Sequence, residues 1–269
     1  MGKNLYNLTS PQKAILYTEQ FYKNTTVNNI CGTVLIKEKI NFEKLINAIH
    51  IFLKENDSFR IRLTLNDKQE YKQYFSNDYI LDSDPIILLN SYDDLLLLEN
   101  KIASIPFSLV DSQLFKIQLF RFKDNSGGFI VNAHHLVADA CTASLVASKI
   151  ITIYSSLVQG IDSTDSPTSY INYINSEKSY FSDTKFRKDK EYWEEIFSTN
   201  YEVASIPSIK DENTVSCRAN RKSFTISNSN MKLINEFCSK YKISVFNFFM
   251  GIYAIYISKV TSLEKFIIG

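Results

Sequence analysis

The chain has 269 residues, 45% of them hydrophobic and 22% charged, which is typical of a globular protein with one large domain or two moderate ones. Its formal net charge of +1 gives no global field that would attract nucleic acid or an anionic membrane. The four cysteines lie far apart without a CxxC pair, which argues against a zinc site or a disulfide framework and fits a reducing cytoplasm.

The first half of the chain predicts alternating helices and strands. Ser10 followed by Pro11 is typical of a helix start, and this helix should extend to about Phe21. A strand rich in β-branched residues over 29–37 precedes a helix that Asn41 caps. The next predicted elements are a strand over 58–65, a paired strand over 70–75, a helix over 91–104 and a hairpin of strands 113–122 and 127–135.

The second half is predicted to be mostly helical. A long helix over 139–159 carries apolar side chains on one face and ends at Gly160. Two amphipathic helices follow over 166–181 and 184–198, and residues 199–217 have no periodicity, which is typical of a connector.

The last residues predict a strand over 221–226, a helix capped by Ser227 or Asn228, and a buried apolar helix over 244–258. This apolar run is shorter than the roughly 20 residues that a membrane span needs. The final stretch, KFIIG, resembles a buried strand that stops as it begins. We therefore expect the chain to be a fragment of a longer protein.

Two of the three histidines are adjacent in the stretch NAHHLVADAC, residues 132–141. They end a predicted strand just before a helix, and histidine suits general base catalysis because its unperturbed pKa lies near neutrality. Side chains alternate along a strand, so His134 and His135 should point to opposite sides. Asp139 can cap the following helix or pair with an arginine. The spacing alone leaves open that the pair is purely structural.

Four stretches in the same order resemble motifs of one family. HHLVADA resembles the HHxxxDG motif of condensation domains of nonribosomal peptide synthetases, members of the acyltransferase superfamily with a chloramphenicol acetyltransferase-like fold. LTSPQKAILYTEQF is similar to the family's Ser-x-x-Gln helix start, and SYINYI to its aromatic motif after the active-site helix. ENDSFRIRL is similar to the RHExLRTxF motif, with Phe59 and Arg60 at its Leu-Arg and with Asn56 and Asp57 in place of His and Glu.

The resemblance implies an α/β fold of two similar lobes with a tunnel between them. In this sequence, residues 1–198 would form a complete N-terminal lobe with the active-site motif, 199–217 the inter-lobe connector and 218–269 the start of a truncated C-terminal lobe. Because the tunnel would lack most of one wall, the fragment alone should be inactive.

The family also implies the reaction: the amine of a carrier-bound amino acid attacks a thioester-bound acyl or peptidyl donor and forms an amide. His135 would be the catalytic residue, as a base or as a hydrogen-bond partner of the tetrahedral intermediate, with His134 packing inside the lobe. Asp139 would form an ion pair with Arg60 and hold the loop. Ala140 replaces the motif's glycine, so its methyl group could narrow the donor's path.

The resemblance implies no covalently bound cofactor and no metal. Substrates would arrive on the phosphopantetheine of carrier proteins, or as acyl-CoA if the domain is a starter type, which the opening YTEQFYKNTTVNNICGTVLI resembles. An ordinary elongation domain remains open. The implied partners are peptidyl or acyl carrier domains and an adjacent adenylation domain, acting in lipopeptide antibiotic synthesis, with no nucleic acid and no membrane. The N-terminus lacks the apolar core of a signal peptide, so we expect a cytoplasmic location.

Two alternatives stay open. An epimerisation domain of the same superfamily shares the HHxxxDG motif. A non-catalytic remnant that docks carrier proteins is favoured by Ala140 and the early stop, and opposed by the presence of His135, Asp139 and Arg60.

Overall fold

The computed structural model describes residues 4–81, 86–161, 168–198, 204 and 222–268. It divides the chain into two compact units, Met1–Ser182 and Asp183–Gly269. The predicted connector over 199–217 lies outside the described residues apart from Ala204, so the predicted lobe boundaries stay a prediction.

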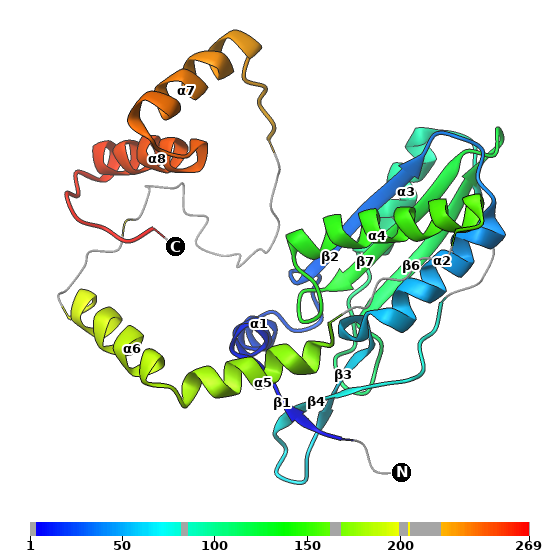
Figure 1. The fold of residues 1–269 in the computed structure, drawn as a ribbon, viewed down its shortest axis with the longest axis horizontal. Helices are drawn as coiled ribbons and strands as arrows, with labels where there is room; N and C mark the ends of the chain where they lie inside the picture. The colour runs from blue at the N-terminus through cyan, green and yellow to red at the C-terminus, as the bar shows by residue number, and fades with distance from the viewer. Residues whose placement is uncertain (1–3, 82–85, 162–167, 199–203, 205–221, 269) are drawn as a thin grey trace. The chain divides into compact units, whose positions relative to one another are not determined.

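A four-stranded sheet with the order β2-β7-β6-β5 forms the centre of the N-terminal unit (Figure 1). The strands β2 (Asn29–Ile36), β7 (Gly127–His134) and β6 (Phe115–Phe122) are antiparallel, and they confirm the predicted strand and hairpin. The short β5 (Ile87–Leu89), which the sequence did not predict, pairs in parallel with β6 at the edge.

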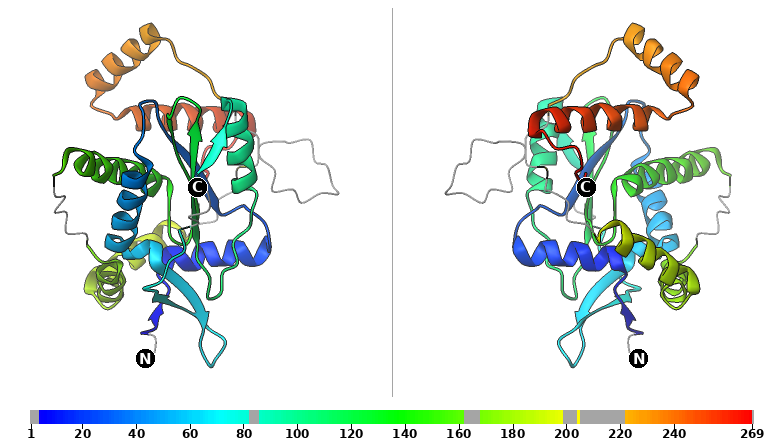
Figure 2. Two further views of the ribbon diagram at one scale, coloured as in Figure 1. Left: turned by 90° about the vertical axis from the view of Figure 1, so that its right-hand side faces the viewer. Right: turned by 90° about the vertical axis from the view of Figure 1, so that its left-hand side faces the viewer.

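Helices cover both faces of this sheet. The helices α2 (Phe42–Glu55) and α4 (Ala140–Gln159) pack on one face, and α3 (Tyr92–Ala103) packs on the other (Figures 1 and 2). The consecutive residues Phe129 and Ile130 belong to different core clusters, because side chains alternate across a strand. The first face buries Leu45, Ile49, Phe52, Ile117, Phe129, Val146 and Ile150, and the second buries Leu95, Ile102, Phe120 and Ile130.

The ends of the helices follow capping chemistry. The Asn41 side chain accepts a hydrogen bond from the Lys44 amide and caps α2, and Gly160 ends α4 with a left-handed φ of 71°. The helix α1 (Ser10–Phe21) is capped by Thr9, one residue before the predicted cap. The reason is a capping box, in which the Gln12 side chain accepts a hydrogen bond from the Thr9 amide at 2.9 Å.

A second sheet has the antiparallel order β1-β4-β3. It joins β1 (Tyr6–Asn7), which was not predicted, to the predicted pair β4 (Tyr71–Phe75) and β3 (Ile61–Leu65). A 3-10 turn, η1 (Asp57–Arg60), takes up the first residues of the predicted strand over 58–65, so β3 begins three residues later than expected.

The helix α5 (Tyr170–Phe181) lies beside α1 (Figure 1). The Glu177 carboxylate accepts a hydrogen bond from the Ser10 amide at 2.9 Å, and the Tyr170 hydroxyl lies 3.4 Å from Thr9 Oγ1. A carboxylate at a helix N-terminus is favourable because it satisfies an unpaired amide and meets the positive end of the dipole.

The C-terminal unit contains α6 (Thr184–Ile196), α7 (Asn228–Tyr241) and α8 (Val245–Thr261). Ser227 caps α7, which confirms one of the two predicted caps.

Three expectations for this unit were wrong. Residues 222–226, the described part of the predicted strand, are not a strand, and residues 265–268 contain only an isolated bridge at Phe266. The helix α8 forms as predicted but is not buried: of its residues only Ile257 is buried, whereas Phe246 is 70% exposed. A strand needs a paired neighbour and an apolar helix needs a facing surface, and among the described elements α8 packs chiefly on α7.

By length and composition alone, α4 is apolar enough to cross a membrane, and α7 with α8 would pass the same test together although they meet at 98°. In the structure α4 packs against α2 and places Val146, Ile150 and Ile153 in the core. Its apolar composition is therefore accounted for by packing within the unit.

The close pairing of β2 with β7 generates a stability prediction. A Cβ added at Gly128 would overlap the carbonyl oxygen of Val34, whereas a Cβ added at Gly32 would meet no heavy atom within 4 Å. We expect Gly128→Ala to lower the free energy of unfolding by about 1–3 kcal/mol, as overpacking does. Urea unfolding measures this, with Gly32→Ala in the same sheet as the matched control. Equal stability of the two variants would contradict the described pairing.

Candidate functional site

The loop that follows β7 is held by backbone hydrogen bonds on both sides. The His134 amide donates to the Leu114 carbonyl at 2.8 Å, and the His135 amide donates to the Asn28 carbonyl at 2.8 Å. The Val137 amide then turns back to the His134 carbonyl at 3.0 Å. These bonds fix the direction in which the chain leaves the sheet, and so fix where the two histidines point.

The two histidines point to opposite environments, as alternation predicts. His134 is 2% exposed and lies edge-on to the Phe107 ring, with 6.2 Å between ring centroids. His135 is exposed and lines an open pocket. The predicted orientations are confirmed, and the catalytic role of His135 stays a prediction.

The hydrogen bonds of His134 set its protonation. Its Nδ1 accepts from the Leu136 amide at 3.1 Å, and its Nε2 lies 3.4 Å from Oε2 of Glu19. Burial lowers the pKa of His134, although the Glu19 carboxylate acts in the opposite direction. The neutral ring with its proton on Nε2 satisfies both contacts, because Nδ1 must remain an acceptor.

The pocket beside His135 has a volume of about 590 Å³. Four segments of the N-terminal unit surround it: the start of α1, the turn η1 with the start of β3, the loop from β7 into α4, and the start of α5. The polar side chains that line it are Gln12, Ser58, His135, Asp139, Thr142, Thr168, Ser169, Tyr170 and Tyr173. Among the described residues, no hydrogen bond engages the His135 imidazole, so both ring nitrogens are available to a ligand.

Gln12 supports the loop from the α1 side. Its Nε2 donates to the Leu136 carbonyl at 3.3 Å and to Oε1 of Gln73 at 3.0 Å, and it is buried. Leu136 and Val137 are themselves buried against α1 and β3. The glutamine of the Ser-x-x-Gln motif therefore ties α1 to the loop that presents His135.

Asp57 supports the wall that α5 provides. Its carboxylate accepts hydrogen bonds from the Ser169 hydroxyl at 2.5 Å and from the Tyr170 amide at 2.9 Å. Asp57 stands at the glutamate position of the RHExLRTxF motif. A carboxylate there anchors the first turn of α5, and with it the two tyrosines that line the pocket.

Asp139 caps α4 and does not pair with Arg60. One carboxylate oxygen accepts from the Thr142 amide and from the Thr142 hydroxyl, each at 2.7 Å. These bonds lower the pKa of Asp139, and the nearby His135 adds a smaller effect in the same direction. Arg60 instead donates to the Ser76 carbonyl at 3.2 Å.

The predicted ion pair between Arg60 and Asp139 is therefore wrong, since no ion pair joins them in the described part of the chain. The carboxylate is already satisfied at the helix N-terminus, and Arg60 ends a 3-10 turn that directs its guanidinium toward Ser76. The arginine that is buried is Arg62, whose pKa is lowered by burial and which donates to the carbonyls of Phe59, Ile61 and Asp78 and to Gln113.

Ala140, at the glycine position of the motif, is the first residue of α4 and is exposed. It lines neither the His135 pocket nor the cavity described next, and it has no positive φ. The backbone at this position does not require glycine.

A second cavity of about 250 Å³ lies between the central sheet and α4. Its lining is mainly apolar, with Ile30, Val34, Val131, Ala143, Val146 and Ala147 among its residues. Ala138 and Thr142 line both this cavity and the His135 pocket. An apolar chain and a reacting polar group could therefore occupy adjoining spaces.

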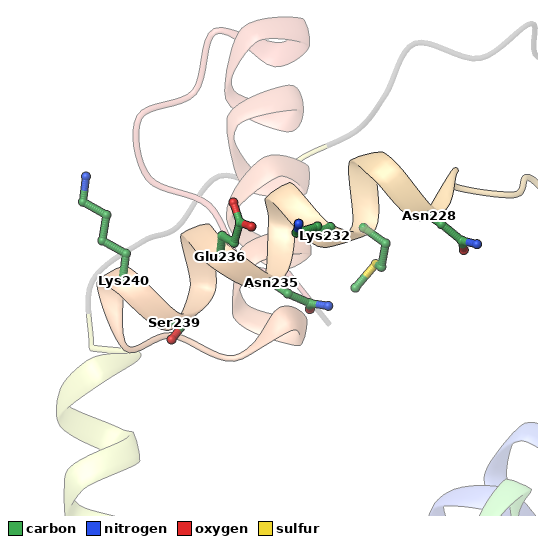
Figure 3. Close-up of a pocket in the computed structure, with 7 residues that line it drawn as sticks. Asn228, Lys232, Asn235, Glu236, Ser239 and Lys240 are labelled. Atoms are coloured by element: carbon green, nitrogen blue, oxygen red, sulfur yellow. The ribbon is translucent and has the colours of Figure 1, made fainter.

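A hollow of about 780 Å³ along α7 is a weaker candidate (Figure 3). Its labelled side chains are Asn228, Lys232, Asn235, Glu236, Ser239 and Lys240, all on one face of the helix. A single helix face does not enclose a substrate. In the parts of the chain that the structure describes, no group of three or more His, Cys, Asp or Glu side chains could hold a metal ion.

Several supporting residues carried no functional signal in the sequence. Glu19 and Asn28 contact His134 and His135 only after the chain has folded, because they lie more than 100 residues away in sequence. No defining motif position falls on either residue. Gln12 and Asp57 lie inside the motif-like stretches LTSPQKAILYTEQF and ENDSFRIRL, but their partners, Leu136 and Ser169, are distant in sequence.

Comparison with known proteins identifies a family. The family model described as "Condensation domain" matches residues 3–269. Surfactin synthase subunit 1 of Bacillus subtilis (strain 168) is 29% identical over 275 residues, which cover 100% of this chain and 8% of that protein. A plipastatin synthase of the same organism is 27% identical over 281 residues, covering 100% and 11%. The chain spans about a tenth of the length of these relatives.

Solved structures share the fold. The first condensation domain of the CDA synthetase superposes with a TM-score of 0.75 at 12% identity, covering 97% of this chain and 64% of that one. The starter condensation domain of the rhizomide synthetase RzmA superposes with a TM-score of 0.69 at 19% identity, covering 76% and 50%. The predicted α/β fold of the chloramphenicol acetyltransferase-like class is confirmed.

The environment of His134 generates a pH prediction. Its pKa is lowered from 6.5 on folding, so the unfolded chain binds the proton more readily. The stability that the neutral ring contributes is complete above about pH 6.5 and is lost as the pH falls toward the folded pKa. Urea unfolding between pH 7.5 and 5 should show this loss, and His134→Asn should reduce it. His50→Asn is the control, and an equal reduction there would contradict the assignment.

Proposed function

The chain belongs to the condensation-domain family. We propose that, within an intact synthetase, it contributes His135 to amide formation by acyl transfer. The observation that carries the proposal is an exposed imidazole with both nitrogens available, held by a rigid loop at a pocket of about 590 Å³. The same pocket adjoins an apolar cavity, which gives a place for an acyl group beside the reacting histidine.

The proposed reaction joins the carbonyl carbon of an acyl thioester to the nitrogen of an amino acid. The C–N bond forms, the C–S bond breaks, and a proton from the amine finally resides on the departing thiol. An α-ammonium group has a pKa near 8, so a proton must leave the nitrogen before or during the attack. The His135 imidazole would accept that proton, or donate a hydrogen bond to the charge of the tetrahedral intermediate.

Asp139 would assist without carrying a proton. Its carboxylate is held by two hydrogen bonds from Thr142, and its pKa is lowered by them, so it stays ionised beside His135. This fixed negative charge would meet the positive charge that develops on the His135 ring during the reaction. This role replaces the loop-holding ion pair that the sequence predicted.

We propose further that the donor is a fatty acyl thioester and that the domain is of the starter subtype. A starter condensation domain of the rhizomide synthetase has been crystallised in complex with C8-CoA, which supports a coenzyme A thioester as one donor. The apolar cavity next to His135 suits such a chain, because each buried CH₂ contributes about 0.8 kcal/mol of transfer free energy.

The acceptor would be an amino acid on the phosphopantetheine arm of a carrier domain, activated by an adenylation domain of the same synthetase. The relatives are synthases about ten times longer than this chain, which supports neighbouring domains of this kind. We propose a cytoplasmic location, which the widely spaced, unpaired cysteine pattern of the sequence supports.

The role of His135 is tested with an acyl donor and an aminoacyl carrier, and the acyl-aminoacyl product is followed by mass spectrometry. General base catalysis contributes about 10²–10⁴-fold, so His135→Ala in the intact protein should lower kcat by at least about 100-fold. His50→Ala is the control, because His50 lies on α2 and bonds to Tyr79 away from the pocket. Product formation by His135→Ala at the parental rate would remove His135 from the mechanism. The 269-residue chain alone, assayed beside it, should form no product.

The donor assignment is tested by filling the apolar cavity. Ala147 lines the cavity, and its neighbour Ser148 is exposed and lines neither cavity. We expect Ala147→Phe to lower kcat/KM for an octanoyl donor by about tenfold or more while affecting an acetyl donor less, since only the longer chain must enter. Ser148→Phe should leave both unchanged. An equal loss for both donors would place the acyl chain elsewhere.

A further inference from the structure

Glu19 is a buried carboxylate that the proposed reaction does not use. It lies on α1, is 9% exposed and lines neither the His135 pocket nor the apolar cavity. Its Oε2 accepts a hydrogen bond from Nδ2 of Asn28 at 2.5 Å and lies 3.4 Å from Nε2 of His134. Burying a carboxylate is costly unless hydrogen bonds satisfy it, and in this case two donors converge on one oxygen.

Asn28 and His134, the two partners of Glu19, also bond to the backbone at His135 and Leu136. The backbone carbonyl of Asn28 accepts the His135 amide at 2.8 Å. His134 precedes His135 in the chain, and its Nδ1 accepts the Leu136 amide at 3.1 Å. The carboxylate thus connects to the backbone on either side of His135 through one intermediate residue each.

The carboxylate also determines which nitrogen of His134 carries the proton. Oε2 of Glu19 already accepts a hydrogen bond from Asn28, and Nε2 of His134 donates to the same oxygen. In the neutral ring this leaves Nδ1 without a proton and able to accept from the Leu136 amide. With the other tautomer, two N–H groups would face each other at Leu136 and the turn that presents His135 would open.

We propose that Glu19 is a positioning residue for His135, acting through Asn28 and through the tautomer of His134. This inference deepens the proposed function and rests on it for its effect on the rate. Its effect on the geometry of His135 does not depend on the reaction. A misplacement of about 1 Å can lower a rate by about 10²-fold, so removal of the carboxylate should lower kcat by tenfold to a hundredfold. The KM values should change by less than about threefold, because Glu19 touches no substrate.

Four variants separate positioning from general stability. Glu19→Met removes the acceptor at similar volume, and Glu19→Asp withdraws it by one methylene while keeping the charge. Glu19→Gln retains one acceptor oxygen, on which both donors can still converge, and should recover most of kcat. Gln20→Met is the matched control, because Gln20 is the next residue of α1 and is exposed.

Hydrogen exchange at the His135 amide gives a readout that needs no activity. In the parent this amide is protected by its bond to Asn28, and Glu19→Met and Glu19→Asp should raise its exchange rate by about tenfold or more relative to Gln20→Met. The imidazole ¹⁵N signals, simple to assign with three histidines in the chain, should show the Nε2–H form of His134 becoming less populated.

The outcomes separate the two proposals. Unchanged exchange and ¹⁵N signals in Glu19→Asp would overturn the positioning role even if Glu19→Met fails to fold. Altered signals in the Glu19 variants together with an intact synthetase that forms no product would uphold the positioning and overturn the proposed reaction. The positioning role would also be overturned if Glu19→Gln and Glu19→Met lost kcat equally while the exchange rate of the His135 amide stayed unchanged. In that case the hydrogen-bond acceptor at residue 19 would not determine the rate.

Discussion

The hydrogen bond from the Leu136 amide to Nδ1 of His134 is the contact on which the site depends. It requires a buried, neutral histidine at the end of β7, and burial in turn comes from strand alternation. Because this bond turns the chain at Leu136, His135 is left exposed at the pocket while Leu136 and Val137 enter the core. His134 is thus structural, although it is the same residue type as the candidate catalytic residue His135.

The start of α4 separates the His135 pocket from the apolar cavity. Asp139 uses its carboxylate as the helix cap, which orients Thr142 between the His135 pocket and the apolar cavity. The cap therefore fixes three things at once: the direction of α4, an ionised group near the imidazole, and the boundary between polar and apolar space. A pairing of Asp139 with Arg60 would have left the helix start unsatisfied.

Local patterns predicted what local chemistry determines. Periodicity located the helices and the β6–β7 hairpin, capping residues located most helix ends, and alternation gave the opposite orientations of His134 and His135. The motif resemblance included stretches that form parts of α1, η1 and α5, but it did not predict that they meet in one pocket. The prediction of an ion pair with Arg60 failed because the sequence allows Asp139 either an arginine partner or the start of α4. Only the fold determines that it caps the helix. The exposure of α8 likewise depends on what faces it, which its own residues do not encode.

Interactions across long sequence separations were invisible for the same reason. Glu19 and His134 are 115 residues apart, and Asp57 and Tyr170 are 113 residues apart. Each pair joins a carboxylate to a group that a neighbouring element presents only after folding. Both carboxylates satisfy hydrogen-bond donors behind the pocket wall, and neither meets the space that a substrate would fill. The polar support from Glu19, Asn28 and Asp57 therefore lies outside the pocket, whereas Gln12 and Asp139 also line it. Because these groups satisfy one another or the backbone, no hydrogen bond in the described part of the chain engages the His135 imidazole, which can meet a substrate.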